Sequence, residues 1–331
     1  MAFKGWDKTV INTRDGQVEG VAPVIISASR ATDIPAYHSR WFMNRLENGY
    51  VKWINPFNRQ PQYISFAKTR VIVFWTKNPE PMLDLLPQLD QAQINYYFQY
   101  TLNDYQSENL EPNLPSLEER ISTFKDLSRK IGKEKVIWRF DPLVLMGNMT
   151  VADLLARIER VGQEIHAYTS KLVVSFVDIK GYQKVERNLQ KQKLACRELT
   201  TSDINELAEG LQELNQSWNL ALATCAEGYD LSDFGIQPNK CIDGQLMLRL
   251  FSHDQKLLDF LHQANNLKDK GQRALCGCIA SKDIGQYNTC LNLCAYCYAN
   301  NSPRTVRTNF NSIEKLGWNS ETIIPQTRDM V

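Results

Sequence analysis

The sequence predicts an α/β protein built on a full or partial parallel (β/α) barrel. Short apolar runs recur along the chain, amphipathic stretches of helical length separate most of them, and the runs lead into polar or turn residues. Several runs are rich in Val, Ile and aromatic residues on both faces, which is typical of parallel strands covered by helices. The chain has 331 residues, 43% of them hydrophobic, and one such barrel takes about 250 residues.

The expected strands cover residues 24–27, 70–75, 94–100, 135–140, 172–177 and 220–225. Two of the helices between them start with a capping box, formed by Ser116 with Glu119 and by Thr150 with Asp153. We find no internal repeat, low-complexity segment or interdomain linker. We therefore expect one barrel domain over residues 1–331, with the main βα repeats in 1–222 and a Cys-rich, cluster-binding segment integral to the barrel in 223–331.

Charge and the N-terminal segment exclude several classes of protein. Lys and Arg total 38 against 37 Asp and Glu, so no global field attracts the chain to nucleic acid or to an anionic membrane. Its first ten residues lack the apolar core of a signal peptide, and no stretch approaches the roughly 18 apolar residues of a membrane span. We expect a cytoplasmic protein without membrane contact, in which eight cysteines indicate metal binding or catalysis rather than disulfides.

Three of these cysteines lie in one short segment. Cys290, Cys294 and Cys297 form the pattern C-x3-C-x2-C within TCLNLCAYCYAN, with Tyr296 directly before the last thiol. With eight cysteines in 331 residues, the expected number of cysteines that are followed by two more at these two spacings by chance is about 0.005. Three thiolates can each bind one iron of a 4Fe-4S cluster, which leaves the fourth iron open to S-adenosylmethionine. A zinc site completed by a fourth ligand and ordinary buried thiols are the alternatives.

Four more cysteines make up a second set. Cys225, Cys241, Cys276 and Cys278 are the full ligand number of an auxiliary 4Fe-4S cluster or a structural zinc ion, and we favour iron-sulfur. In a strand, the C-x-C pair would direct both thiols to one face. Buried structural thiols are the alternative for this set. Cys196 lies in a predicted helix, where we expect an ordinary packed cysteine.

The polar ends of the expected strands supply candidates for a cofactor pocket, because function in parallel barrels lies at the carboxyl ends of strands. S-adenosylmethionine needs acceptors, donors and an apolar or aromatic slot. By position we nominate Ser27, Ser29, Thr32 and Asp33 for its amino-acid end, and Arg139, Asp141, Ser175 and Asp178 for the cofactor or substrate. Arg139 and Asp141 could instead form a structural ion pair, and any one polar end could merely turn the chain.

A few other side chains have less specific roles. Lys77 and Asn78 follow an expected strand and could meet substrate, and Glu227 could act as an acid or base or could cap a turn. The histidines are scattered without metal-ligand spacing, so we interpret them as structural or surface residues. No nucleophile-base triad is present in the pattern, and we assign no catalytic residue.

The cysteine triplet carries a resemblance. It matches the signature of the radical S-adenosylmethionine superfamily, including the aromatic residue before the last cysteine, and CAYCYAN resembles the cluster loop of spore photoproduct lyase and its relatives. SRATDIP and WRFDPL resemble two strand-end segments of those relatives. Nearly end to end, the chain is similar to an uncharacterised bacterial domain of unknown function with a C-terminal cysteine cluster, through ISASRATDIPA, NPFN, VFWTKNPEP, VIWRFDPL, SFVD, CAE, CIDG and CGCIASKDIGQYNTC.

The resemblance implies a radical S-adenosylmethionine barrel in which a 4Fe-4S cluster and S-adenosylmethionine generate a 5'-deoxyadenosyl radical, with Tyr296 among the cofactor-binding residues. The cluster loop comes last instead of first, which a circular permutation explains if residues 274–280 form the first strand and residues 24–27 the second. A reductant such as flavodoxin or ferredoxin is the implied partner. The substrate is unknown, and a nucleic-acid base or lesion is one candidate class of substrate. The rings of Trp75, Tyr97 and Tyr100 could stack on bases or could belong to the core. The alternative is a non-catalytic binding protein stabilised by zinc or iron-sulfur.

Overall fold

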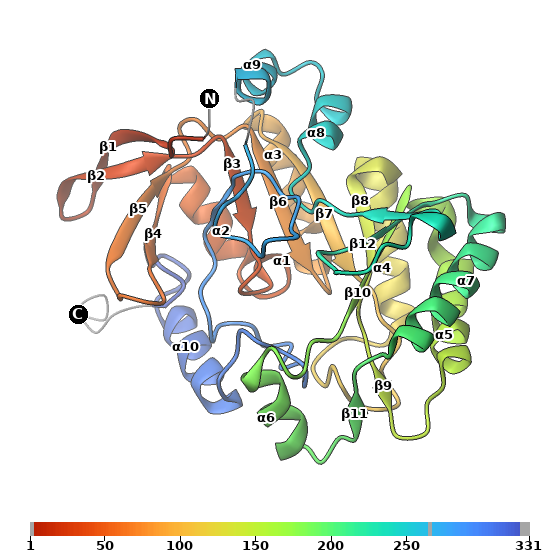
Figure 1. Ribbon diagram of the computed structural model, residues 1–331. Helices are drawn as coiled ribbons and strands as arrows, with labels where there is room; N and C mark the ends of the chain where they lie inside the picture. Colours follow the sequence, from red (N-terminus) through yellow and green to blue (C-terminus); the bar gives the residue numbers. More distant parts are fainter. Residues whose placement is uncertain (1–2, 264–266, 325–331) are drawn as a thin grey trace.

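The computed structural model describes residues 3–263 and 267–324 (Figure 1). At its centre lies an eight-stranded sheet in which every hydrogen-bonded neighbour pair is parallel. In spatial order the strands are β13 (Ile236–Pro238), β12 (Ala221–Thr224), β10 (Lys171–Phe176), β8 (Val136–Leu143), β7 (Asn95–Thr101), β6 (Val71–Thr76), β3 (Ile25–Ala28) and β14 (Lys282–Asp283).

The predicted parallel α/β architecture is confirmed at this level, since all six expected strands occur in this sheet. Pairing within the described chain does not join the edge strands β13 and β14, so a closed barrel is not shown. The prediction for residues 274–280 was wrong: they are irregular apart from one bridge at Ile279, and β14 is the strand that pairs with β3. The glycine between Cys276 and Cys278 weakens strand formation there.

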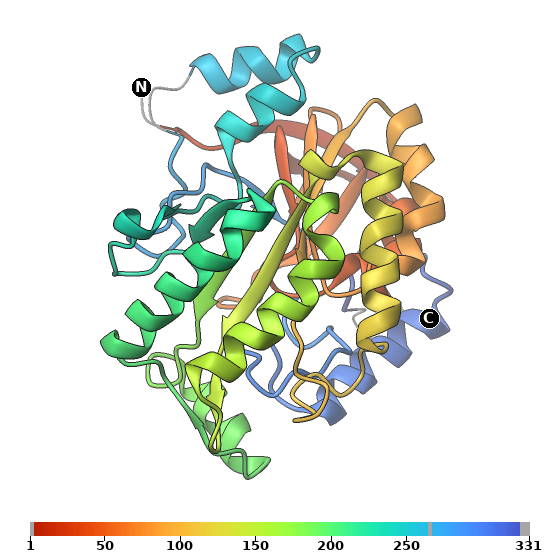
Figure 2. The same cartoon turned by 90° about the vertical axis from the view of Figure 1, so that its right-hand side faces the viewer.

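The two faces of the sheet are buried differently, as period-2 alternation requires. On the outer face, Ile72, Phe98 and Trp138 belong to a large core shared with the surrounding helices. Figure 2 shows three of these helices side by side: α4 (Leu117–Ile131), α5 (Val151–Ile165) and α7 (Thr201–Trp218). On the inner face, the side chains pack with the second cysteine set and with helices α8 (Gly244–Leu250) and α9 (Gln255–Gln263).

The helix starts follow the local sequence. Both predicted capping boxes form: the side chain of Ser116 accepts a hydrogen bond from Glu119 N, and that of Thr150 accepts one from Asp153 N. The remaining helices are α1 (Ile34–Tyr37), α2 (Ser39–Glu47), α3 (Leu86–Gln91), α6 (Gln183–Lys191) and α10 (Pro303–Lys315), with 3-10 turns at Glu80–Leu85, Lys133–Lys135, His166–Tyr168 and Ser232–Phe234. Helices α4 and α5 therefore start where a preceding side chain can satisfy a free backbone N–H group.

Two smaller sheets were not predicted from the sequence. One contains, in spatial order, β1 (Asp7–Thr13), β2 (Gly16–Ala22), β5 (Pro61–Ser65) and β4 (Tyr50–Ile54). The other pairs β11 (Cys196–Arg197) with β9 (Leu145–Met146), so the expected helix at Cys196 was wrong. Among the described residues, no helix has both the length and the apolar character needed to cross a membrane.

Candidate functional site

The loop that carries the cysteine triplet lies against the carboxyl ends of several strands. Ala295 N donates to Leu110 O at 2.8 Å, in the connection after β7. Asn292 Nδ2 donates to Asp33 Oδ2 at 3.1 Å, after β3, and Asn188 Nδ2 donates to Cys297 O at 3.2 Å, from α6 after β10. Figure 1 shows α6 and α10 at the end of the sheet toward which the strand arrows point. Parallel strands place their functional side chains at this end.

The three thiols of the triplet are buried or half-buried, and backbone groups surround them. Ala299 N donates to Cys297 Sγ at 3.3 Å, and the backbone N–H groups of Asn292 and Asp33 favour the charged form of the Cys290 thiol, which lowers its pKa against the effect of burial. Burial raises the pKa of all three thiols, including that of Cys294. Without a bound cation, the three sulfurs therefore stay protonated thiols at neutral pH.

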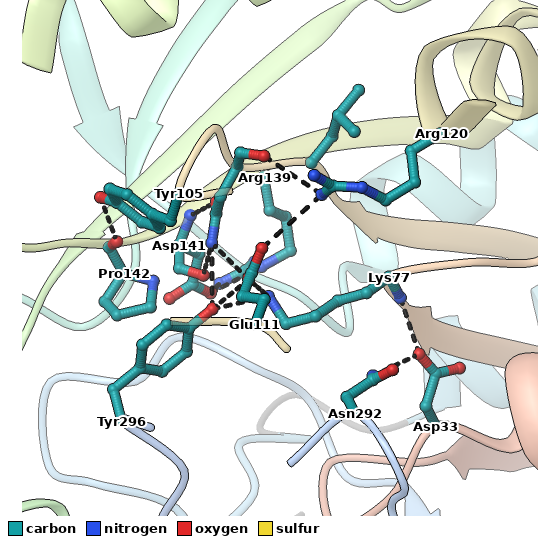
Figure 3. Close-up of polar contacts among 12 residues, drawn as sticks. Asp33, Lys77, Tyr105, Glu111, Arg120, Arg139, Asp141, Pro142, Asn292 and Tyr296 are labelled. Carbon is teal, nitrogen blue, oxygen red and sulfur yellow. Dashed lines mark hydrogen bonds and ion pairs between the residues drawn. The ribbon is translucent and has the colours of Figure 1, made fainter. Parts of the chain in front are cut away.

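Beside the triplet, a buried polar network centres on Glu111 (Figure 3). Its Oε1 accepts hydrogen bonds from Lys77 Nζ at 2.7 Å and from Asn103 Nδ2 at 3.1 Å, and it also accepts one from the Tyr296 hydroxyl. Burial alone would raise the pKa of Glu111, but the charges of Lys77 and Arg120 hold it below the ordinary value. The network fixes Tyr296, the aromatic residue directly before the last cysteine.

Asp33 joins the strand end after β3 to the one after β6. Its Oδ2 accepts from Lys77 N at 2.8 Å as well as from Asn292, while its Oδ1 caps α1 by accepting from Ala36 N at 3.0 Å. Burial raises the pKa of this carboxyl. Asp33 thus orients both the Lys77 segment and the cysteine loop, whether or not it meets a ligand.

Arg139 and Asp141 connect the triplet region with the second cysteine set. Arg139 Nε donates to Asp141 Oδ2 at 2.9 Å, and its Nη1 donates to Cys241 Sγ at 3.1 Å. Asp141 also accepts from the Ser175 hydroxyl, while its backbone N–H donates to Asn103 Oδ1 at 2.8 Å. Arg139 keeps the pKa of Asp141 below the ordinary value although burial opposes this. Arg139 and Asp141 therefore form the ion pair that the sequence analysis gave as an alternative, and this pair lies between the two sets of thiols.

The structure separates several other candidates from this network. Ser27 donates to Asp283 Oδ2 at 3.0 Å on the neighbouring strand, and Ser29 Oγ accepts from Ala31 N at 2.9 Å. The Thr32 hydroxyl is buried without a hydrogen-bond partner in the described chain. Asp178 is exposed and accepts from Gly181 N at 2.7 Å, so it holds a turn.

The remaining candidates lie in turns, in the core or near the second cysteine set. Asn78 accepts from Glu80 N at 3.3 Å, which closes a local turn. Tyr97 and Tyr100 are fully buried and belong to the core, so their rings are not free to stack on bases. Glu227 accepts from Phe176 N at 3.1 Å, and burial raises its pKa to about 7.

Three residues of the site were missed in the sequence. Asn103 lies in QYTLND, at the polar end of the expected strand over residues 94–100, so position could have identified it. Asn292 lies between the first two cysteines of the triplet, so the motif could have drawn attention to it. Glu111 lies in a connecting segment without a motif, and only its contacts reveal it. Glu111 and Arg120 also line a cavity of about 230 Å³, together with Gln106, Asn109, Pro112, Leu114 and Pro115.

The donor chemistry decides which groups the triplet could hold. Within residues 3–263 and 267–324, no three or more His, Cys, Asp or Glu side chains are arranged so that they could hold a metal ion. In a cubane cluster each thiolate binds a different iron, so its ligands do not converge on one point. Three sulfur donors with N–H groups directed at two of them fit such a cluster in number and chemistry.

Comparison with known proteins identifies the family and little beyond it. No curated protein matches the sequence. A solved structure from Bacteroides thetaiotaomicron, described as "a putative alpha-L-fucosidase", matches 75% of this chain and 83% of that chain at 11% sequence identity. Its TM-score of 0.23 does not establish a shared fold. The family model described as "Domain of unknown function (DUF1848)" matches residues 25–299 and includes both sets of cysteines. The chain therefore belongs to the DUF1848 family.

Proposed function

We propose that this protein is a radical S-adenosylmethionine enzyme in which Cys290, Cys294 and Cys297 hold a 4Fe-4S cluster. The observation that carries the proposal is the position of the cysteine loop, which contacts residues after β3, β7 and β10 at the carboxyl end of the sheet. When bound, the cluster and S-adenosylmethionine supply a 5'-deoxyadenosyl radical and methionine, through transfer of one electron to the sulfonium. The electron comes from an external donor, for which we propose a flavodoxin or ferredoxin.

The order of strands supports the permuted-barrel form of the proposal. β14 pairs in parallel with β3, and the triplet begins seven residues after β14 ends at Asp283. In this arrangement β14 takes the place of a first strand and β3 that of a second, with the cluster loop directly after the first. The eight parallel strands would then form a partial barrel of the radical S-adenosylmethionine type.

The chain's own residues have defined tasks in this proposal. Lys77 places a positive charge near Cys294, which offsets negative charge on the sulfur ligands. Glu111 holds Lys77 in place through an ion pair and accepts from the Tyr296 hydroxyl, so that the loop between the last two cysteines keeps one conformation. Asn292 and Asp33 hold the opposite end of the loop. Substrate remains unassigned, and the burial of Tyr97 and Tyr100 removes two side chains that would have favoured a nucleic acid.

The test is anaerobic reconstitution with iron and sulfide, followed by electron paramagnetic resonance of the reduced protein with and without S-adenosylmethionine. We expect a signal that shifts when S-adenosylmethionine is added, and formation of 5'-deoxyadenosine. Both should disappear in the C290S/C294S/C297S variant and persist in Cys196→Ser, which removes a thiol of neither set. Zinc binding without any response to S-adenosylmethionine would instead favour a non-catalytic, metal-stabilised binding protein.

A further inference from the structure

The second cysteine set converges in space from three separate segments. Cys225 follows β12, Cys241 precedes α8, and Cys276 and Cys278 lie in the irregular segment before β14. The sulfur atoms of Cys225 and Cys241 are 3.6 Å apart. The Cys278 thiol interacts with the thiols of both Cys241 and Cys276. Four thiols that are far apart in sequence thus form one contiguous group on the inner face of the sheet.

Several N–H donors are directed at the sulfur atoms of this group. Cys278 Sγ accepts from Cys241 N at 3.2 Å and from Ile242 N at 3.3 Å. Cys241 Sγ accepts from Arg139 Nη1 at 3.1 Å and from Asn239 Nδ2 at 3.3 Å. N–H groups directed at sulfur are the usual outer-shell partners of metal-bound cysteines.

Two arginines, the buried Arg139 and the half-buried Arg30, face the same thiols. Arg139 contacts Cys241 directly, and Arg30 interacts electrostatically with Cys241 and Cys278 as well as with Asp283. Arg30 Nη2 is buried and has no hydrogen-bond partner among the described residues, and the same is true of the oxygen of the Asn239 amide. A divalent ion or a 4Fe-4S core with charge +2 carries about two negative charges once four thiolates bind it. The two guanidinium groups offset part of that excess charge, since Arg139 also pairs with Asp141 and Arg30 interacts with Asp283.

We propose that Cys225, Cys241, Cys276 and Cys278 form a second metal centre with four thiolate ligands, distinct from the cysteine triplet. The proposal does not depend on the function proposed above, because it concerns other thiols, which pack on the inner face of the sheet rather than in the loop at its carboxyl end. Four sulfur ligands select either zinc or an iron-sulfur cluster. Ordinary buried thiols would require neither the hydrogen-bond donors nor the two arginines, since a packed cysteine behaves as a small hydrophobe.

Zinc and an iron-sulfur cluster require different spacings of the four thiols. Tetrahedral zinc-thiolate bonds of about 2.3 Å place neighbouring sulfurs roughly 3.8 Å apart, close to the spacing of Cys225 and Cys241. No three His, Cys, Asp or Glu side chains in the described part of the chain are arranged to hold one ion, so some of the thiols must move for zinc to bind. Ligands to a cubane each bind a different iron and lie farther apart.

The experiment uses the full-length C290S/C294S/C297S variant. Any metal that this variant binds through cysteine must be held by the remaining thiols. Anaerobic samples are incubated separately with Zn²⁺ and with iron plus sulfide, desalted, and analysed for metal per chain and for absorption spectra. We expect about one zinc or about four irons per chain. Adding C276S/C278S should reduce binding to background, whereas adding Cys196→Ser should leave it unchanged, with circular dichroism reporting the fold of each variant.

A further measurement needs no additional variant. Co²⁺ added to the triplet-deficient protein should give sulfur-to-metal charge-transfer absorption, and it should protect four thiols from alkylation. Failure to retain zinc or iron, with no such absorption and with every thiol still reactive, would overturn the proposal. Loss of the S-adenosylmethionine-dependent signal in the wild-type chain, with metal still bound by the triplet-deficient variant, would refute only the proposed function.

Discussion

Replacing Lys77 with methionine tests whether the Glu111 network stabilises the site. Lys77 Nζ lies 2.7 Å from Glu111 Oε1, and their side chains are only 15% and 3% exposed. Removing one partner of a buried ion pair typically costs 3–5 kcal/mol, because the other charge stays buried without compensation. Arg120 Nη1 remains 3.6 Å from Glu111 Oε2 and offsets part of this, so we expect a loss of about 3 kcal/mol.

The assay is urea denaturation of the reduced, metal-free protein, followed by circular dichroism. The K77M/E111Q variant removes both charges, so its destabilisation should be smaller than the sum of the two single variants, with a coupling of about 2 kcal/mol. Lys8→Met is the matched control, because Lys8 and Glu19 form an ion pair that is 72% and 67% exposed and should contribute less than about 1 kcal/mol. Equal losses in Lys77→Met and Lys8→Met, or strictly additive effects, would refute the reasoning.

Three further predictions concern stability. His38 is buried, and its Nε2 forms a hydrogen bond with Thr289 O. Burial lowers the pKa of His38 to about 4. The neutral imidazole therefore contributes its full stabilisation of the folded state above pH 6.5, and this contribution falls as the pH drops toward 4. Wild type should lose about 2 kcal/mol more than His38→Gln between pH 7.5 and 5 in urea titrations, and identical losses would contradict this. Gly162→Ala should lower the thermal midpoint of unfolding, because the new Cβ would lie 2.3 Å from the Trp218 ring and overpacking costs about 1–3 kcal/mol. An unchanged or higher midpoint would show that the ring moves freely. Thr150→Ala should cost about 1 kcal/mol by chemical denaturation through loss of a helix cap, and no loss would mean that water replaces it.

Local patterns predicted the main sheet and its helices because each depends on neighbouring residues. Val, Ile and aromatic runs such as residues 94–100 favour strands, and Ser116 caps its helix through a residue only three positions away. The small sheet built from β1, β2, β4 and β5 was missed because its strands are partly exposed and mixed in polarity. β14 has only two residues, too few for any periodic signal.

The sequence by itself determined which thiols belong together in the triplet, since Cys290, Cys294 and Cys297 lie in one loop whose reach is short. It also grouped Cys225 with Cys241, but only the tertiary structure brought their sulfur atoms to 3.6 Å. The same holds for Glu111, which has no motif and acquires its role only when distant segments pack around it. Spacing along the chain limits local geometry, whereas contacts between distant segments depend on how the sheet and its connections fold as a whole.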